Sequence, residues 1–168
     1  QPGITLPQKR EVPSDLMGFD IGSRVTGGGI VFHAPGDGVF SCGGFLKDPY
    51  FPSPLKEKMA FITIKIRDAL KQCGVSATLT EGAQSPDSNL QFCKTYYSPY
   101  ELTVSGEKVL GITMRKLKSR FIIQGCLHIH NNHTAFQHLP DSYTPYLTRG
   151  IGTLTYDPLA PIFFELFS

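Results

Sequence analysis

The chain has 168 residues, of which 40% are hydrophobic and 18% charged, and its formal net charge is +2. This composition is typical of a folded domain with one core and argues against intrinsic disorder. The small net charge, with no basic stripe interleaved with aromatic residues, argues against nucleic acid as a partner. Because no apolar run approaches the length of a membrane span, we expect a cytoplasmic protein without a membrane partner.

The four cysteines are scattered along the chain rather than closely paired: Cys42, Cys73, Cys93 and Cys126. In a reducing compartment this pattern indicates free thiols rather than a disulfide framework. Cys42, Cys73 and Cys126 stand in no motif, and we interpret them as incidental.

The first third of the chain predicts few regular elements. Residues 1–23 are rich in proline and glycine and predict an irregular connection. Residues 30–33 and 38–42 predict a strand pair around the turn composition of residues 34–37. Residues 43–54 predict a loop.

Apolar residues then recur at three- and four-residue spacing, which predicts an amphipathic helix over residues 55–72. They are Leu55, Met59, Ile62, Ile66 and Leu70. Gly74 is a plausible end of this helix. Residues 75–80 alternate and are rich in β-branched side chains, which favours a strand, and residues 81–91 predict a polar loop.

The last third predicts a hairpin, a strand and a helix. Residues 100–104 and 108–114 flank Ser105-Gly106, a hairpin signal. A basic loop at 115–120 and a strand at 121–129 follow, and Asp157-Pro158 predicts the start of a C-terminal helix. We therefore expect an α+β fold, a mostly antiparallel sheet with helices packed on one face, in a single domain over residues 1–168.

The stretch from Arg24 to His33 is the most informative part of the sequence. Three glycines, Gly27 to Gly29, precede the apolar run Ile30–Phe32, which indicates a glycine turn that leads into a strand. Such a turn lets a ligand lie directly on the backbone N–H groups, and an arginine before it can bind a phosphate or carboxylate. The alternative is a tight turn with an unrelated arginine.

Two segments resemble one known family. Residues 23–41 read SRVTGGGIVFHAPGDGVFS and residues 100–116 read YELTVSGEKVLGITMRK. They are similar to signatures of the lipoate–protein ligase and octanoyltransferase family, relatives of biotin–protein ligase. The family's arginine, Thr/Ser-Gly-Gly-Gly run and strand-ending histidine correspond to Arg24, Thr26–Gly29 and His33, and its Lys-x-x-Gly to Lys108 and Gly111. The resemblance implies a class II biotin/lipoate ligase-like fold, here without the family's N-terminal part.

The resemblance also implies roles for these residues. Lys108 would contact the acyl carbonyl and the activated phosphate or thioester, where an ammonium stabilises charge that develops on oxygen. Without the resemblance, Lys108 would be a solvated lysine on a strand edge. Gly111 would let its strand pass close to the ligand. The implied binding residues are Arg24, Thr26, Gly27, Gly28, Gly29, His33 and Gly111.

Cys93 is a second catalytic candidate. In the cysteine-dependent octanoyltransferases of the family, a nucleophilic cysteine precedes the lysine at about this spacing. Its thiolate attacks an acyl donor, and the thioester then passes the acyl group to a lysine of the acceptor. The alternative is an incidental cysteine.

The two segments favour different mechanisms. The Gly27–Gly29 block is closer to the ligases, so we predict ATP-dependent activation of lipoate or octanoate, with Mg²⁺ accompanying the ATP. The acceptor would be a lysine of a lipoyl domain, in a 2-oxoacid dehydrogenase or the glycine cleavage H protein. The surroundings of Cys93 are closer to the transferases, so the alternative is a Cys93-dependent octanoyltransferase that uses octanoyl-acyl carrier protein.

A second alternative is a non-catalytic acyl-binding remnant. The chain has Gln124-Gly125 where the family usually has His-Gly, and Ile112 and Thr113 where it has small residues.

Histidines at 128, 130 and 133 raise the question of a metal site. Alternation would place His128 and His130 on one face, but no cysteine or carboxylate of matching spacing completes a ligand set. We therefore predict no metal site and a polar strand end. We interpret His33 as a residue that orients the glycine turn.

Overall fold

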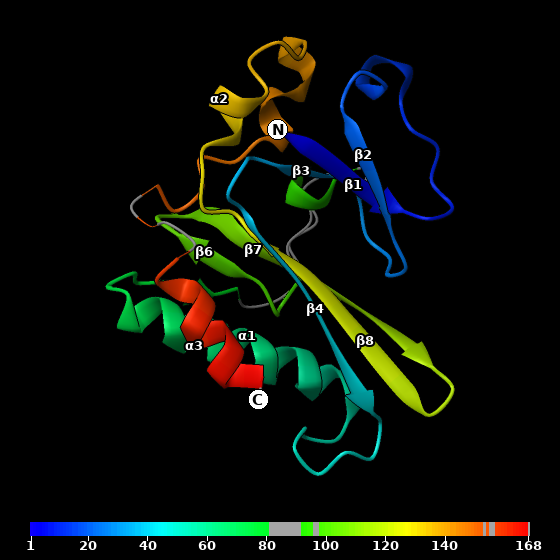
Figure 1. The fold of residues 1–168 in the computed structure, drawn as a ribbon, viewed down its shortest axis with the longest axis vertical. Helices are drawn as coiled ribbons and strands as arrows, with labels where there is room; N and C mark the ends of the chain where they lie inside the picture. Colours follow the sequence, from blue (N-terminus) through cyan, green and yellow to red (C-terminus); the bar gives the residue numbers. More distant parts are fainter. Residues whose placement is uncertain (81–91, 96–97, 153, 155–156, 168) are drawn as a thin grey trace.

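The computed structural model describes residues 1–80, 92–95, 98–152, 154 and 157–167. It confirms the α+β class. The larger sheet is antiparallel, with strand order β4-β8-β7-β6-β5. Its strands are β4 (Gly38–Phe45), β5 (Thr78–Leu79), β6 (Leu102–Val104), β7 (Glu107–Leu117) and β8 (Arg120–Leu127). The helices α1 (Leu55–Gln72) and α3 (Leu159–Phe167) contact each other and cover one face of this sheet (Figure 1).

A second, three-stranded sheet lies at the end of the molecule opposite α1 and α3 (Figure 1). Its order is β2-β1-β3, with β1 (Gly3–Pro7) parallel to β2 (Asp20–Arg24) and antiparallel to β3 (Val31–His33). The short helices α2 (Asn132–Ala135), η1 (Ser14–Leu16) and η3 (Asp141–Tyr146) belong to this part. Each sheet has its own hydrophobic core, and the chain crosses between them several times.

The amphipathic pattern at 55–72 predicts the longest helix correctly. Ile62, Ile66 and Leu70 are fully buried against the large sheet, as their spacing along one helical face requires. Gly74 ends the helix as expected, with a positive φ of 79°.

The expectation of an irregular connection at residues 1–23 is wrong. Ile4 and Leu6 alternate with more exposed residues in β1 and pack into the core of the small sheet. The alternation of buried and more exposed residues spans only five positions. The prolines and glycines around it favoured the prediction of an irregular connection. The strands β1 and β2 matter for the site because they hold Thr5 and Arg24.

The strand pair expected around residues 34–37 is also wrong, although both strands exist. The turn is present, with Asp37 N donating to Ala34 O at 3.1 Å. However, β3 pairs with β1 and β4 pairs with β8, so the two strands belong to different sheets. β4 also continues to Phe45, three positions beyond the predicted end.

The hairpin at Ser105-Gly106 is confirmed, with φ values of 52° and 81°. The basic loop expected at 115–120 is wrong because β7 runs to Leu117 and β8 begins at Arg120, leaving a turn of Lys118 and Ser119. The strand expected over 75–80 is limited to Thr78–Leu79. The C-terminal helix is confirmed, and the loop expected at 81–91 lies outside the described residues.

All four cysteines lie in the described part of the chain and are free thiols, as predicted. Among the described helices, none combines the length and the apolar character that crossing a membrane requires.

Candidate active site

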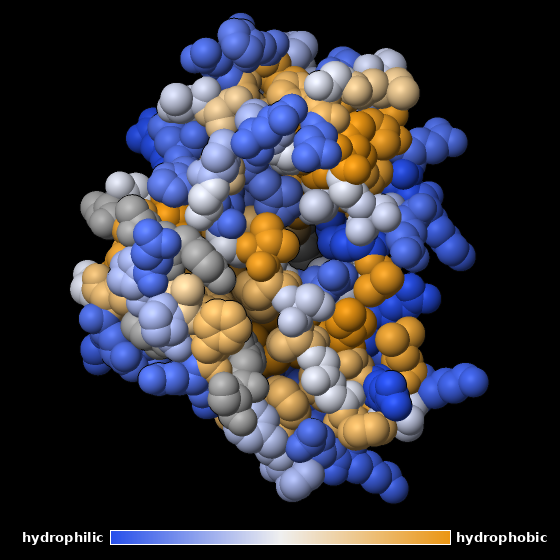
Figure 2. Space-filling view, in the orientation of Figure 1, coloured by the Kyte–Doolittle hydropathy of each residue, from blue (hydrophilic) through white to orange (hydrophobic). Residues whose placement is uncertain are grey.

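A cavity of about 700 Å³ lies between the two sheets. Figure 2 shows a hollow at this junction, with apolar and polar atoms at its rim. Gly27, Gly28 and Gly29 line the cavity from one side, and Lys108 and Gly111 of β7 line it from the other. The two segments that resemble one family therefore share one cavity.

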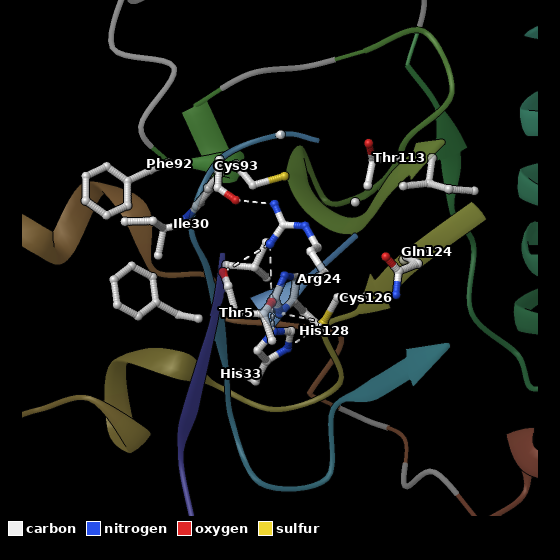
Figure 3. Close-up of a pocket in the computed structure, with 18 of the residues that line it drawn as sticks. Thr5, Arg24, Ile30, His33, Phe92, Cys93, Thr113, Gln124, Cys126 and His128 are labelled. Atoms are coloured by element: carbon white, nitrogen blue, oxygen red, sulfur yellow. Dashed lines mark hydrogen bonds between the residues drawn. The ribbon is translucent and has the colours of Figure 1, made fainter. Parts of the chain in front are cut away.

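Arg24 at the end of β2 holds the glycine loop in shape (Figure 3). Its Nη1 donates to Thr5 O at 3.0 Å, its Nε donates to Gly27 O at 3.3 Å, and its Nη2 donates to Gly29 O. Gly28 has a φ of +97°, which favours glycine. A Cβ at Gly27 would meet nothing within 4 Å, and Gly27 is one of the residues that line the cavity.

Gln124 of β8 anchors the same loop. Its Oε1 accepts hydrogen bonds from Thr26 N at 3.3 Å and from Thr26 Oγ1 at 2.9 Å. Thr26 is buried, with 1% of its surface exposed. Sequence analysis noted Gln124 only as a departure from the family pattern, and no local signal indicates its contact with Thr26.

Replacing Gln124 with alanine should therefore destabilise the fold by about 1–3 kcal/mol, because the buried N–H and hydroxyl of Thr26 lose their acceptor. Urea unfolding of the variant measures this change. Gln124→Glu keeps an oxygen acceptor and serves as the matched control. Equal unfolding midpoints for Gln124→Ala and the unmodified chain would show that the contact with Thr26 does not stabilise the loop.

Lys108 is buried, so the reading of a solvated strand-edge lysine is wrong. β7 lies between β6 and β8, and only 3% of the Lys108 side chain is exposed. Its Nζ lies 2.7 Å from Glu101 Oε1 and donates to Cys93 O at 2.7 Å. Burial raises the pKa of Glu101, an effect that the Lys108 charge partly offsets. Glu101, which sequence analysis missed, therefore neutralises and orients the ammonium.

Cys93 lies beside this ammonium. It begins the short helix η2 (Cys93–Thr95), and its Sγ lies 3.8 Å from Lys108 Nζ. Cys93 N donates to Ile30 O at 2.9 Å, which ties η2 to the end of the glycine loop. A Cβ at Gly111 would lie 3.5 Å from the Cys93 sulfur and 3.6 Å from Lys108 Cε, so glycine keeps the space around both groups open.

His33 forms a second polar cluster in the cavity wall. One ring nitrogen, Nε2, lies 2.7 Å from Thr5 Oγ1, and Nδ1 lies 3.2 Å from Cys126 Sγ. Burial lowers the pKa of His33 to about 4, so its imidazole is neutral at neutral pH. His33 reaches the glycine loop through Thr5, which also accepts from Arg24.

Cys126 also belongs to this wall, although the sequence indicated an incidental cysteine. Burial raises the pKa of its thiol well above the ordinary value. On its other side, His128 Nδ1 lies 3.7 Å from the Cys126 sulfur and 3.1 Å from Asp37 Oδ2. By contrast, His130 lies against Gly36 and His133 belongs to α2.

Two side-chain oxygen atoms of the cavity wall stand without a partner in the described part of the chain. Ser98 Oγ and Asn132 Oδ1 are buried and have no hydrogen-bond partner among the residues that the structure describes. Because buried polar groups are nearly always paired, these two atoms are free to bind a ligand or water in the cavity. The sequence carried no signal for either residue.

Comparisons with known proteins identify the family of this chain. Residues 10–148 match the model of the lipoyl protein ligase A/B catalytic domain. The chain belongs to this family. A search of curated protein sequences finds no match.

Solved structures show the same lipoyl ligase fold at low sequence identity. A lipoate-protein ligase A bound with ATP is 16% identical, with a TM-score of 0.73 over 100% of this chain and 68% of that chain. Protein Ta0514 from T. acidophilum with bound lipoic acid is 17% identical, with a TM-score of 0.70 over 100% and 68%. A bi-partite lipoate protein ligase, studied with its E2 lipoyl domain from Thermoplasma acidophilum, is 15% identical, with a TM-score of 0.70 over 100% and 67%. The expected class II ligase-like fold is confirmed.

Proposed function

We propose that this chain attaches a lipoyl or octanoyl group to a lysine of a lipoyl domain, and that it acts as an ATP-dependent ligase. The observation that carries the proposal is the single cavity shared by the Gly27–Gly29 loop and Lys108. Its volume of about 700 Å³ is in the range of pockets that hold drug-sized ligands. We also propose that residues 1–168 form one catalytic domain, because both sheets build the cavity.

The residues fit an acyl-adenylate. The open side of Gly27 leaves room for a phosphate to approach the backbone, and Arg24 supplies a positive charge next to the loop. The Lys108 ammonium would lie against the acyl carbonyl and stabilise the negative charge that develops when the acceptor amine attacks. Mg²⁺ is expected to accompany the ATP phosphates.

Two of the similar structures support ATP and lipoate as the ligands, since they hold ATP and lipoic acid. The similar bi-partite ligase and its E2 lipoyl domain support a lipoyl domain as the acceptor. Free thiols in the described residues fit a reducing compartment, which supports the cytoplasm as the place of the reaction.

A second candidate is the octanoyltransferase, which the contact between Cys93 and Lys108 favours. The sulfur lies 3.8 Å from the Lys108 ammonium, so a nucleophile and a group that can stabilise charge on an acyl oxygen lie side by side. In this mechanism the Cys93 thiolate attacks the thioester of octanoyl-acyl carrier protein and releases the carrier thiol. The acceptor lysine then displaces Cys93.

The experiment compares two acyl donors with a purified lipoyl domain as acceptor, and mass spectrometry follows both proteins. We expect lipoate with ATP and Mg²⁺ to modify the lipoyl domain, and the Cys93→Ala variant to retain this activity. The Cys42→Ala variant is the matched control.

The opposite result would overturn the ligase. Octanoyl-acyl carrier protein would then acylate the chain without ATP, and Cys93→Ala would remove the adduct. Binding of lipoate or octanoate without turnover of either donor would overturn both enzymes and favour the acyl-binding remnant.

A further inference from the structure

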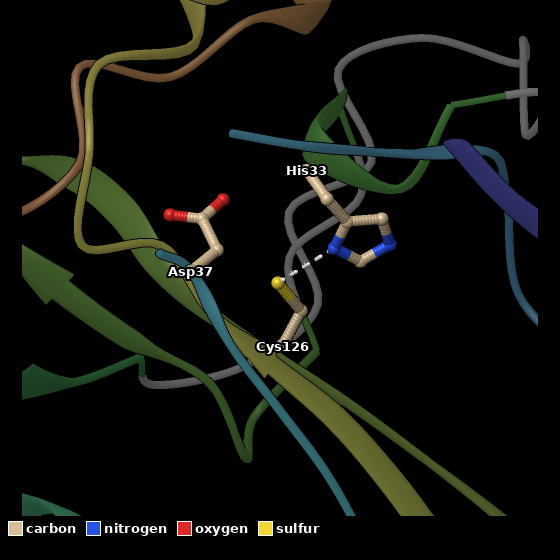
Figure 4. A group of neighbouring side chains, drawn as sticks. All are labelled: His33, Asp37 and Cys126. Carbon is tan, nitrogen blue, oxygen red and sulfur yellow. Dashed lines mark hydrogen bonds between the residues drawn. The ribbon is translucent and has the colours of Figure 1, made fainter. Parts of the chain in front are cut away.

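The cluster of His33, Asp37 and Cys126 brings together three kinds of metal-binding group. One donor atom from each side chain can be chosen so that all three lie within 4.8 Å of one another. Figure 4 shows Cys126 between the other two side chains, with His33 facing its sulfur. The residues come from β3, the turn before β4, and β8, so their meeting depends on the tertiary fold.

The distances suit a small divalent ion. In tetrahedral sites Zn²⁺ lies about 2.0–2.1 Å from nitrogen and about 2.3 Å from sulfur. Neighbouring ligand atoms in such a site are then roughly 3.3–3.6 Å apart. The separation of 3.2 Å between His33 Nδ1 and Cys126 Sγ is close to this value.

Neighbouring groups already orient the three side chains. Thr5 Oγ1 lies 2.7 Å from His33 Nε2 and can accept a hydrogen bond from Nε2–H. In that tautomer the lone pair of Nδ1 faces Cys126. Asp37 Oδ1 accepts from the backbone N–H groups of Ile129 and His130, at 2.8 and 3.1 Å. His128 Nδ1 donates to Asp37 Oδ2, because a carboxylate can only accept. Metal-binding histidines and carboxylates usually have such supporting partners.

The charges of the cluster also match a divalent cation. Asp37 supplies a carboxylate that accepts hydrogen bonds from His128 and from two backbone N–H groups. Only 1% of the Asp37 side chain is exposed. Together with a thiolate, it would neutralise a charge of two.

We propose that His33, Asp37 and Cys126 bind one borderline-soft divalent cation, of which Zn²⁺ is the representative. As the bond between sulfur and metal forms, the S–H bond of Cys126 breaks and its proton passes to solvent. His33 and Cys126 line the cavity, and a water molecule or a ligand there would complete the coordination. Sequence analysis predicted no metal site because it considered only His128, His130 and His133, whereas His33 lies 93 positions from Cys126.

The test uses Co²⁺ as a spectroscopic probe and competition with a chelator to measure Zn²⁺ affinity. We expect one Co²⁺ per chain, with visible bands of a tetrahedral site and a sulfur-to-cobalt charge-transfer band in the near ultraviolet. Cys126→Ser should abolish the charge-transfer band, whereas Cys42→Ser and Cys93→Ala should keep it. Thr5→Val removes the hydroxyl beside His33 and should weaken Zn²⁺ binding by about 10–100-fold.

Absence of stoichiometric Co²⁺ binding would overturn the proposal. A charge-transfer band that survives in Cys126→Ser but disappears in Cys93→Ala would also overturn it, because the metal would then bind beside Lys108. Circular dichroism of each variant verifies that it is folded. The readout is spectroscopic and does not depend on acyl transfer, so it remains informative if the proposed enzyme activity fails.

Discussion

Replacing Lys108 with methionine is expected to lower the rate of acyl transfer to a lipoyl domain by about 10²–10³-fold, the loss seen when one oxyanion donor is removed. Methionine retains much of the side-chain volume but cannot stabilise negative charge on the acyl oxygen. The measurement is the initial rate of lipoyl-domain modification at saturating acyl donor. Lys116→Met, on the exposed end of the same strand, is the matched control and should retain the full rate.

The single substitution also leaves Glu101 buried without its cation, so a loss of rate could reflect misfolding. The double variant Lys108→Met/Glu101→Gln removes both charges and addresses this point. We expect it to be folded by circular dichroism and to remain as slow as Lys108→Met. A folded double variant with an unchanged rate would exclude Lys108 from the chemistry of both proposed enzymes.

Replacing Glu101 with alanine is expected to destabilise the fold by about 3–5 kcal/mol, the usual cost of removing one partner of a buried ion pair. Glu101 Oε1 lies 2.7 Å from Lys108 Nζ, and both side chains are 3% exposed, so solvent screens the pair weakly. The variant also deprives Ser98 N of the acceptor that it contacts at 2.9 Å. Urea unfolding, followed by circular dichroism, measures the loss.

A double-mutant cycle separates the ion pair from the other effects. Lys108→Met/Glu101→Leu replaces both charges with apolar groups and should regain most of the stability lost in Glu101→Ala, because no uncompensated charge remains buried. Surface substitutions usually change the free energy of unfolding by no more than about 0.5 kcal/mol. A change that small in Glu101→Ala would show that the ion pair does not stabilise the fold.

The elements that the sequence predicts well are those whose signal is local. The spacing from Leu55 to Leu70 repeats over several helical turns, and the observed helix is Leu55–Gln72. The turn at Ser105-Gly106 carries its own geometry in two residues. By contrast, β1 has only two buried apolar positions, so nearby prolines and glycines outweighed its alternation.

The same distinction applies to the candidate site. Arg24, the three glycines, Lys108 and Gly111 could be named because each stands in a continuous motif that resembles one family. Glu101 could not be assigned to Lys108 because an acidic residue before a strand is ordinarily exposed. Gln124 lies 98 positions from Thr26, and Cys126 lies 93 positions from His33, so no local pattern relates them.

The order of residues along the chain was enough to establish the family, the long helix and the hairpin. Folding in three dimensions decided which groups meet: it buried Lys108 against Glu101, set Cys93 beside it, and placed Gly111 opposite Cys126 in the register of β7 and β8. The physical reason is the distance along the chain over which each interaction acts. Turn geometry and amphipathic periodicity act over a few neighbouring residues, whereas strand register and the burial of two separate cores act between segments that are distant in sequence.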